Sequence, residues 1–507
     1  MAGNGSTRRE RLLAAIAIAM VLAFGVWLRW PGFVQGGFAS HDVGGILYNA
    51  MVLADGELPY VADVELKAPG SFYLAWAFAG DRGTDIARLQ VWANAWALLS
   101  ALAVAMTAWH AFGARTAPVA ALVAVLADAH LDSMDANYVT WSQLPQILAM
   151  SWGLAAARCS GPSRTLGFVV AGAMCGFAMM IKQPTGIVVV ALAASVPLWS
   201  RDRAELLRAW WHIALGVAVV HVPLALHYAA HGELLALATA YPLNRWGIDY
   251  VVAGGRDHPW PLPIEGTLAT VHFLALPLVL AAFAIVKPER ALARSVAWPL
   301  VIWALATIAA AWVGARFYKG YFLAAAPPLA LLAAAPWGVL GGRLRVKPAL
   351  RVALLIPVVV LLARQLRLDL DMRNDRARCH DDGARTIAKH IAPKLPDDAT
   401  IWVWGWHLWD LYAMTGKRSP TVVYKSLGLI TPPNDDTWRL SATKESFVDG
   451  AWAHRLIEDF EADPPTYVIL GSTAPHRQFD ALRELLGRDY VRDHGLKIGR
   501  VEIWRRK

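Results

Sequence analysis

The first residues of this chain whose types could do chemistry are His41 and Asp42, in the stretch FASHDVGGILYNAM. The stretch follows an apolar run at 11–29 that is long enough to cross a membrane. A carboxylate at such a boundary can accept a proton from an attacking hydroxyl group, and a neighbouring histidine can tune that carboxylate. A structural interpretation stays open for both, because Asp42 or Ser40 could cap a helix and His41 could face water.

Charged and polar residues stand at the ends of other apolar runs. Lys182 and Arg316 each lie at the predicted outer end of a membrane helix, and Tyr318 follows Arg316 closely. A charged side chain at that depth must face a partner or a water-filled cavity, although Arg316 could also only fix its helix end. Asp132 and Asp135 lie in the short stretch HLDSMDANY, where they could orient a site or remain solvated.

The composition indicates which elements must position these residues. The chain has 507 residues, of which 56% are hydrophobic and 17% charged, and this balance predicts a polytopic α-helical membrane protein. Eleven membrane helices are predicted, at 11–29, 86–111, 116–130, 141–158, 165–181, 185–199, 206–226, 267–286, 296–314, 321–341 and 349–366. The first is predicted to be a retained anchor and not a cleaved signal peptide.

The net charge of +9 does not indicate nucleic-acid binding, because the basic residues form short clusters between the apolar runs. These clusters fall on alternate connections, which the positive-inside rule places in the cytoplasm. The N-terminus is then cytoplasmic, and the long connections 31–85, 131–140 and 227–266 are extracytoplasmic. The three cysteines are widely separated and indicate neither a disulfide framework nor a metal site.

The chain changes character after the last predicted span. A membrane domain at 1–366 is followed by a charged segment, 367–507, in which short helical and strand patterns alternate. This alternation predicts a small α/β domain, which the topology places on the outer, periplasmic side. Trp402, Trp404 and Trp406 alternate along one predicted strand, and packing in the core of that domain is favoured over stacking on a sugar.

The first outer loop, 31–85, carries the most specific pattern. An apolar helix is followed by Asp42, by a helix that contains Tyr48 and is predicted to lie on the membrane surface, and then by GELPY and KAPGSFYL. The order resembles the first external loop of the GT-C glycosyltransferases, and is similar to glycosyltransferase family 39 and to the lipid A aminoarabinose transferases. GAMCGFAMMIKQPTG, GARFYKGYFLAAAPPLALLAA and IWVWGWHLWDLYAMTGKRSPT resemble further segments of these proteins.

The resemblance implies roles for individual residues. It implies a catalytic base at Asp42 with His41 beside it, and binding of the lipid phosphate by Lys67, with Arg316 and Lys182 as further ligands. Lys67 could instead be an interfacial lysine that extends to headgroups. Asp132, Asp135 and Tyr318 are candidates for orienting the site. Many relatives have Asp-Glu where this chain has Asp42-Val43, and Lys-Pro-Pro where it has Lys67-Ala68-Pro69.

The resemblance also implies an activity. The expected reaction is inverting transfer of a sugar from a polyprenyl phosphate to a hydroxyl group of a glycan, lipid or protein, on the outer face of a bacterial inner membrane. No cofactor or metal is expected, because His130 and Asp132 alone do not make a metal site. A flippase or transporter is less favoured since no internal repeat is visible. An envelope glycan ligase is less favoured because its catalytic loop usually comes late in the chain.

Overall fold

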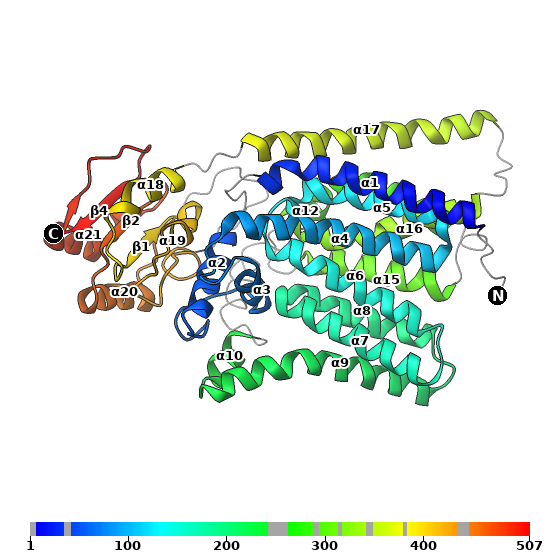
Figure 1. Cartoon of the computed structure of the whole chain (residues 1–507), viewed down its shortest axis with the longest axis horizontal. Coiled ribbons are helices and arrows are strands. Elements are labelled where there is room, and N and C mark those ends of the chain that lie inside the picture. The colour runs from blue at the N-terminus through cyan, green and yellow to red at the C-terminus, as the bar shows by residue number, and fades with distance from the viewer. Residues whose placement is uncertain are drawn as a thin grey trace.

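The computed structural model describes residues 7–34, 42–241, 262–286, 294–312, 317–340, 348–378, 383–432 and 446–507. A long helical bundle occupies one end of the molecule and a small sheet domain the other, with the N-terminus at the bundle end farthest from the C-terminus (Figure 1). The bundle helices are α1 (Arg8–Val34), α4 (Ile86–Phe112), α5 (Ala117–Asp128), α6 (Tyr138–Ala156), α7 (Gly161–Ile181), α8 (Ile187–Ser195), α9 (Arg203–Ala230), α12 (Leu262–Val271), α13 (Ala275–Val286), α15 (Arg294–Ala310), α16 (Ala326–Leu340) and α17 (Pro348–Arg378).

Each predicted span overlaps helical structure in this bundle. In the part of the chain that the structure describes, seven helical stretches are long and apolar enough to cross a membrane. The chain is therefore a multi-pass membrane protein, while the count of eleven spans stays a prediction. The segment at 185–199 is among the shorter stretches, because Pro184 ends the preceding helix and α8 is flanked by 3₁₀ turns.

Small residues allow the bundle helices to pack closely. A Cβ atom added at Gly172 of α7 would lie 2.1 Å from the carbonyl oxygen of Ile213 on α9, and one added at Gly216 of α9 would lie 2.0 Å from that of Val169. The hydrophobic effect does not drive helices together in lipid, so van der Waals contact between closely packed backbones stabilises their association. The two glycines thus join α9, at one edge of the bundle, to its neighbour (Figure 1).

Basic residues of the predicted inner connections cluster at the end of the bundle that holds the N-terminal end of α1. Arg115, between α4 and α5, pairs with Glu10 of α1. Arg158, after α6, donates to the carbonyl oxygen of His110 near the end of α4 at 2.6 Å. The contacts place these connections on one side, as the positive-inside pattern requires, and the cytoplasmic orientation of that side stays a prediction.

The C-terminal region contains the predicted α/β pattern. Its sheet has the strand order β1-β2-β4-β3, with β1 (Ile401–Trp404) parallel to β2 (Tyr467–Leu470), and with β4 (Glu502–Arg506) antiparallel to β2 and to β3 (Tyr490–Arg492). Four helices accompany the sheet: α18 (Ala384–Ile391), α19 (Asp410–Thr415), α20 (Ala451–Ala462) and α21 (Asp480–Asp489). Trp402 and Trp404 are buried, 6.0 Å apart between ring centres, in the core of this domain.

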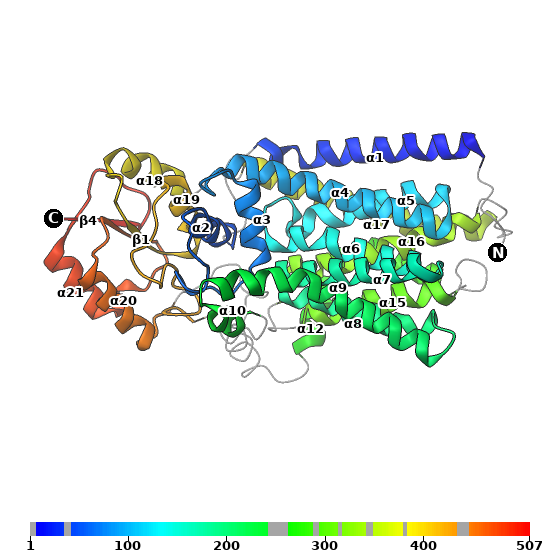
Figure 2. The same cartoon turned by 60° about the horizontal axis from the view of Figure 1, so that its bottom comes forward.

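The junction between bundle and sheet domain differs from a simple linker. Helix α17 continues beyond residue 366, the end of the predicted membrane domain, as far as Arg378. In the described part of the chain, the short helices α2 (Asp42–Ala54) and α3 (Gly70–Phe78) lie between the two parts, and α10 (Leu234–Ala240) lies beside the end of α9 (Figure 2).

The prediction that the first of these helices lies on the membrane surface is wrong. Every side chain of α2 from Val43 to Leu53 is buried. Helix α19 of the C-terminal domain packs on α2, and a Cβ atom added at Gly44 would lie only 2.7 Å from the backbone nitrogen of Asp410. The apolar residues of α2 are therefore those of a helix packed on several sides. One of its packing partners is the C-terminal domain, which is far away in the sequence.

Candidate active site

Asp42 and Lys67 form the centre of the candidate site. Asp42 is the first residue of α2, and its Oδ1 lies 2.9 Å from Nζ of Lys67, in the connection between α2 and α3. The two side chains are 29% and 28% exposed, so a ligand can reach them. Burial alone would lower the pKa of Lys67, but the Asp42 carboxylate beside it holds that pKa well above its ordinary value. Lys67 is therefore a cation at any physiological pH.

The ring of Tyr138 lies against Lys67 and a second lysine, Lys182, which also contacts the ring of Tyr321. Nζ of Lys67 lies 4.6 Å from the ring centre of Tyr138, at the start of α6, and 3.4 Å from its hydroxyl oxygen. Nζ of Lys182 lies 5.2 Å from the same ring and 4.3 Å from the ring of Tyr321. Aromatic faces attract cations at this range, so the rings bring both ammonium groups to one place.

Lys182 owes its position to the end of α7. Pro184 cannot continue the helix, and the Thr185 hydroxyl donates to the carbonyl oxygens of Ala178 and Lys182 at 2.6 Å each. Burial, followed by repulsion from Lys67, lowers the pKa of Lys182 to about 7, and Asp42 opposes the shift. An anion bound here would restore the proton on Lys182, because it would offset both effects.

A second aspartate–lysine pair borders the tyrosines. Nζ of Lys319 lies 3.0 Å from Oδ1 of Asp132, and both side chains are about as exposed as the first pair, at 33% and 38%. Tyr318 packs edge-on against Tyr321, with 5.5 Å between ring centres, which links this pair to Lys182. Asp132 has a φ of 65°, a left-handed conformation that aspartate adopts more readily than most residues.

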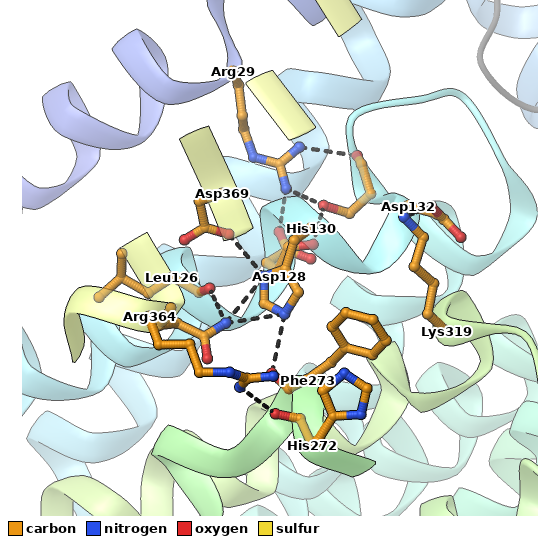
Figure 3. A network of polar contacts seen from close by, with 12 residues as sticks. Arg29, Leu126, Asp128, His130, Asp132, His272, Phe273, Lys319, Arg364 and Asp369 are labelled. Atoms are coloured by element: carbon orange, nitrogen blue, oxygen red, sulfur yellow. Dashed lines mark hydrogen bonds and ion pairs between the residues drawn. The ribbon is translucent and has the colours of Figure 1, made fainter. Parts of the chain in front are cut away.

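Buried ionic contacts hold the turn that carries Asp132. This short π-helical turn, η2 (Ala129–Ser133), lies at the end of α5, and Arg29 of α1 reaches across to it (Figure 3). Arg29 pairs with Asp128 and donates to the carbonyl oxygen of Ser133 at 2.9 Å and to Oδ1 of Asn94 at 3.3 Å. Removing one partner of a buried pair is costly, so the contacts fix the turn to α1 and α4.

A second set of contacts fixes the same turn to α17 and to the 3₁₀ turn His272–Leu274, which lies between α12 and α13. Nδ1 of His130 lies 2.7 Å from Oδ1 of Asp369, and its Nε2 lies 3.0 Å from the carbonyl oxygen of Phe273 (Figure 3). Gln365 donates to the carbonyl oxygen of Leu126 at 3.0 Å beside this ring. His130, one of the two residues of the HxD spacing, thus has a carboxylate partner and a carbonyl partner inside the bundle.

The structure places the remaining predicted residues as follows. Asp135 is buried, and its Oδ1 accepts hydrogen bonds from Gln90 at 2.5 Å and from the backbone nitrogen of Ala136 at 2.9 Å. These contacts give Asp135 a task in holding the second outer loop. His41 and Arg316 lie outside the described residues.

Sequence reasoning missed Tyr138, Tyr321 and Lys319 as members of the site. The sequence carried a signal for them, because Tyr138 is the last residue of the stretch HLDSMDANY, and Lys319 and Tyr321 come one and three residues after Tyr318. Tyrosines at the outer ends of membrane helices are common as interfacial anchors, however. A tyrosine that binds a ligand cannot be distinguished from such an anchor by its position in the sequence.

The described residues contain no group of three or more histidine, cysteine, aspartate or glutamate side chains that could hold a metal ion. The expectation of a reaction without a metal or cofactor stays a prediction. The cations that the site does present are the three lysines Lys67, Lys182 and Lys319.

Neither a protein-family model nor a curated protein matches the sequence. Two solved structures share its architecture over most of the chain. ArnT from Cupriavidus metallidurans bound to undecaprenyl phosphate superposes with a TM-score of 0.59 at 16% identity, covering 96% of this chain and 97% of that chain. The archaeal oligosaccharyltransferase AglB from Archaeoglobus fulgidus, in complex with an inhibitory peptide and a dolichol-phosphate, gives 0.56 at 12% identity, covering 92% of this chain and 70% of that one.

This chain has the GT-C fold. ArnT, a lipid A aminoarabinose transferase, and AglB are both members of the GT-C superfamily. The resemblance of the first outer loop to these proteins is confirmed at the level of the fold, and so is a helical membrane bundle with a small C-terminal sheet domain. Sequence identities this low show the fold alone.

Proposed function

We propose that this protein is an inverting glycosyltransferase that uses a polyprenyl-phosphate sugar. It moves a hexosyl or pentosyl group to a hydroxyl acceptor on the outer face of a bacterial inner membrane. The observation that carries the proposal is the carboxylate of Asp42 beside Lys67, with Lys182 against the same tyrosine ring, that of Tyr138. A base and two cations at one place are what the reaction requires.

The base acts on the acceptor. The hydroxyl oxygen of a glycan, lipid or protein attacks the anomeric carbon, the bond from that carbon to the phosphate oxygen breaks, and the hydroxyl proton passes to Asp42. In the structure Asp42 is paired with Lys67. A bound phosphate competes for the same ammonium group, so the hold of Lys67 on the carboxylate weakens and Asp42 can accept the proton. His41 would tune Asp42 from its neighbouring position.

The lysines act on the leaving group. The donor is a phosphodiester with about one negative charge, and the departing polyprenyl phosphate carries about two. Cations at this oxygen therefore stabilise the transition state more than the ground state, which accelerates the reaction without a metal or cofactor. Lys67 and Lys182 are the proposed ligands, with Arg316 as a third, and the Lys319–Asp132 pair and Tyr318 border them.

The reaction is proposed to invert the anomeric centre, because one base and one displacement suffice. A retaining mechanism would need a second carboxylate about 5 Å from the first to form a covalent intermediate. Of the other two carboxylates predicted for the site, Asp132 pairs with Lys319 and Asp135 is buried against Gln90.

The test is release of polyprenyl phosphate by the purified protein in detergent. A panel of polyprenyl-phosphate sugars is supplied with a crude envelope extract as acceptor. Asp42→Asn is expected to lower the rate by roughly 100- to 10,000-fold, the contribution of a general base. Asp55→Asn is the matched control, since Asp55 follows the other end of α2, has a 55% exposed side chain and pairs with Arg418 in the described contacts. It should change the rate less than about twofold.

Loss of release in Asp42→Asn alone supports the proposal and names the sugar. Release that persists in Asp42→Asn removes the assigned base. No release from any donor by the wild type contradicts a transferase, and lipid movement in vesicles would then test the flippase or transporter.

A further inference from the structure

Two consecutive residues of the C-terminal domain reach into the first outer loop. Lys425 and Tyr424 both contact the carboxylate of Glu65, the ammonium group at Oε1 and the hydroxyl at Oε2. Glu65 is 2% and Lys425 3% exposed, so this is a buried ion pair between segments 360 residues apart in the chain. A buried pair of this kind is weak evidence for stability, and its retention calls for another explanation.

The carboxylate of Glu65 also holds the backbone of Lys67. Its Oε1 accepts hydrogen bonds from the backbone nitrogens of Leu66 at 2.5 Å and Lys67 at 3.0 Å. On the other side, the Tyr60 hydroxyl donates to the carbonyl oxygen of Lys67 at 2.6 Å. The direction in which the Lys67 side chain leaves the loop is therefore set by Glu65 and Tyr60.

Tyr424, the first of these two residues, also contacts α2, the helix that begins at Asp42. The ring of Tyr424 stacks on Tyr48 of α2 with 3.9 Å between centres and 2° between planes. A Cβ atom added at Gly45 of α2 would lie 3.0 Å from the Tyr424 hydroxyl, so the Tyr424 side chain reaches close to the backbone of α2. One dipeptide thus contacts the element that carries Asp42 and the loop that carries Lys67.

Glu65 has two cations within electrostatic reach, and only one of them belongs to the candidate site. Burial by itself would raise the pKa of Glu65, but Lys425 holds that pKa below its ordinary value, with a smaller contribution from Lys67. If Lys425 were absent, the nearest remaining cation would be Lys67, two residues away. Glu65 would then compete with Asp42, and with a bound phosphate, for the Lys67 ammonium group.

We propose that Lys425 and Glu65 are positioning residues of the donor site. Lys425 satisfies the Glu65 carboxylate, Glu65 fixes the backbone of Lys67, and the Lys67 side chain is left to Asp42 and the lipid phosphate. The C-terminal domain is thereby a required part of the phosphate-binding site. The inference rests on the proposed function, since it assigns a role relative to the donor.

The test measures binding of polyprenyl phosphate alone to the full-length protein in detergent, which requires no acceptor and no turnover. Lys425→Met is expected to raise Kd by about tenfold or more, because it leaves a buried carboxylate without its partner. Glu65→Gln together with Lys425→Met removes both charges and should bring Kd back to within about threefold of the wild type. Arg418→Gln is the control at the same interface, where Arg418 pairs with the exposed Asp55 and Glu57. Its Kd should stay within about twofold.

A milder variant covers the case in which Lys425→Met does not fold. Tyr424→Phe keeps the ring on Tyr48 and removes only the hydroxyl that donates to Glu65. A hydrogen bond to a charged group should make this about a fivefold increase in Kd.

The outcomes separate the two proposals. A wild type that does not bind polyprenyl phosphate overturns the proposed function and this inference with it. Tight binding by the wild type together with unchanged Kd in Lys425→Met or in Tyr424→Phe overturns the inference alone. A double variant that binds as poorly as Lys425→Met also overturns it, because competition for Lys67 would then not be the cause.

Discussion

Lys182 allows a quantitative test of the phosphate site through pH. Its pKa is lowered to about 7 by burial and by repulsion from Lys67, so above pH 7 the free protein holds Lys182 neutral. A phosphodiester bound about 4 Å away would interact with the ammonium group by about 4 kcal/mol at an effective dielectric constant of 20. This corresponds to a rise of about three pKa units, to about 10 in the complex.

Binding must therefore take up a proton between pH 7 and pH 10. Proton linkage then raises Kd for the donor by several-fold per pH unit, or about 50-fold from pH 7 to pH 9. Lys67 does not contribute to this slope, because Asp42 holds its pKa well above the ordinary value despite burial. The phosphodiester itself does not titrate in this range.

The perturbation is Lys182→Arg, with Lys182→Met beside it. A guanidinium group stays charged across the range, so the arginine variant should bind the donor with a Kd that is flat between pH 7 and pH 9. The methionine variant should be flat as well, and weaker than the wild type at pH 7. Equilibrium binding of a short-chain polyprenyl-phosphate sugar in detergent measures all three proteins. A flat wild-type curve, or a slope that survives in the arginine variant, would refute the reasoning.

Two further predictions concern the first outer loop and its cover. Burial and the neighbouring Glu65 raise the pKa of Asp63 to about 7. Between about pH 4 and pH 7 the folded protein therefore holds a proton on Asp63 that the unfolded chain has released. The free energy of unfolding falls as the pH rises through this range, because the folded state binds more protons than the unfolded state. Asp63→Asn should therefore raise the free energy of unfolding at pH 8 by up to about 4 kcal/mol, which is measured as a higher thermal unfolding midpoint. It should have little effect at pH 4, and equal effects at the two pH values would contradict the prediction. Gly44→Ala would place a Cβ atom 2.7 Å from the backbone nitrogen of Asp410. The variant should lower the free energy of unfolding by about 1–3 kcal/mol and speed proteolysis between the bundle and the sheet domain. Gly487→Ala, in open space on α21, is its control, and matching behaviour of the two variants would show that the Gly44 contact is unimportant.

The sequence by itself determined the elements and the main charged residues of the site. Hydropathy located the helices of the bundle, and the period-two and helical patterns after residue 383 located the strands and helices of the small domain. These features follow from local periodicity, which is written in consecutive residues. The pattern around Asp42, Lys67 and Lys182 was also readable, and the structure brings these three together around Tyr138.

Only the tertiary structure decided what surrounds these residues. The pairing of Lys319 with Asp132, the burial of Asp135 against Gln90, and the insertion of Lys425 beside Glu65 join segments that are far apart in the chain. Helix α2 looked like a surface helix because its second cover, the C-terminal domain, begins more than three hundred residues later. Periodicity fixes which face of a helix is apolar, whereas the partner of that face depends on the shape and close packing of the whole fold.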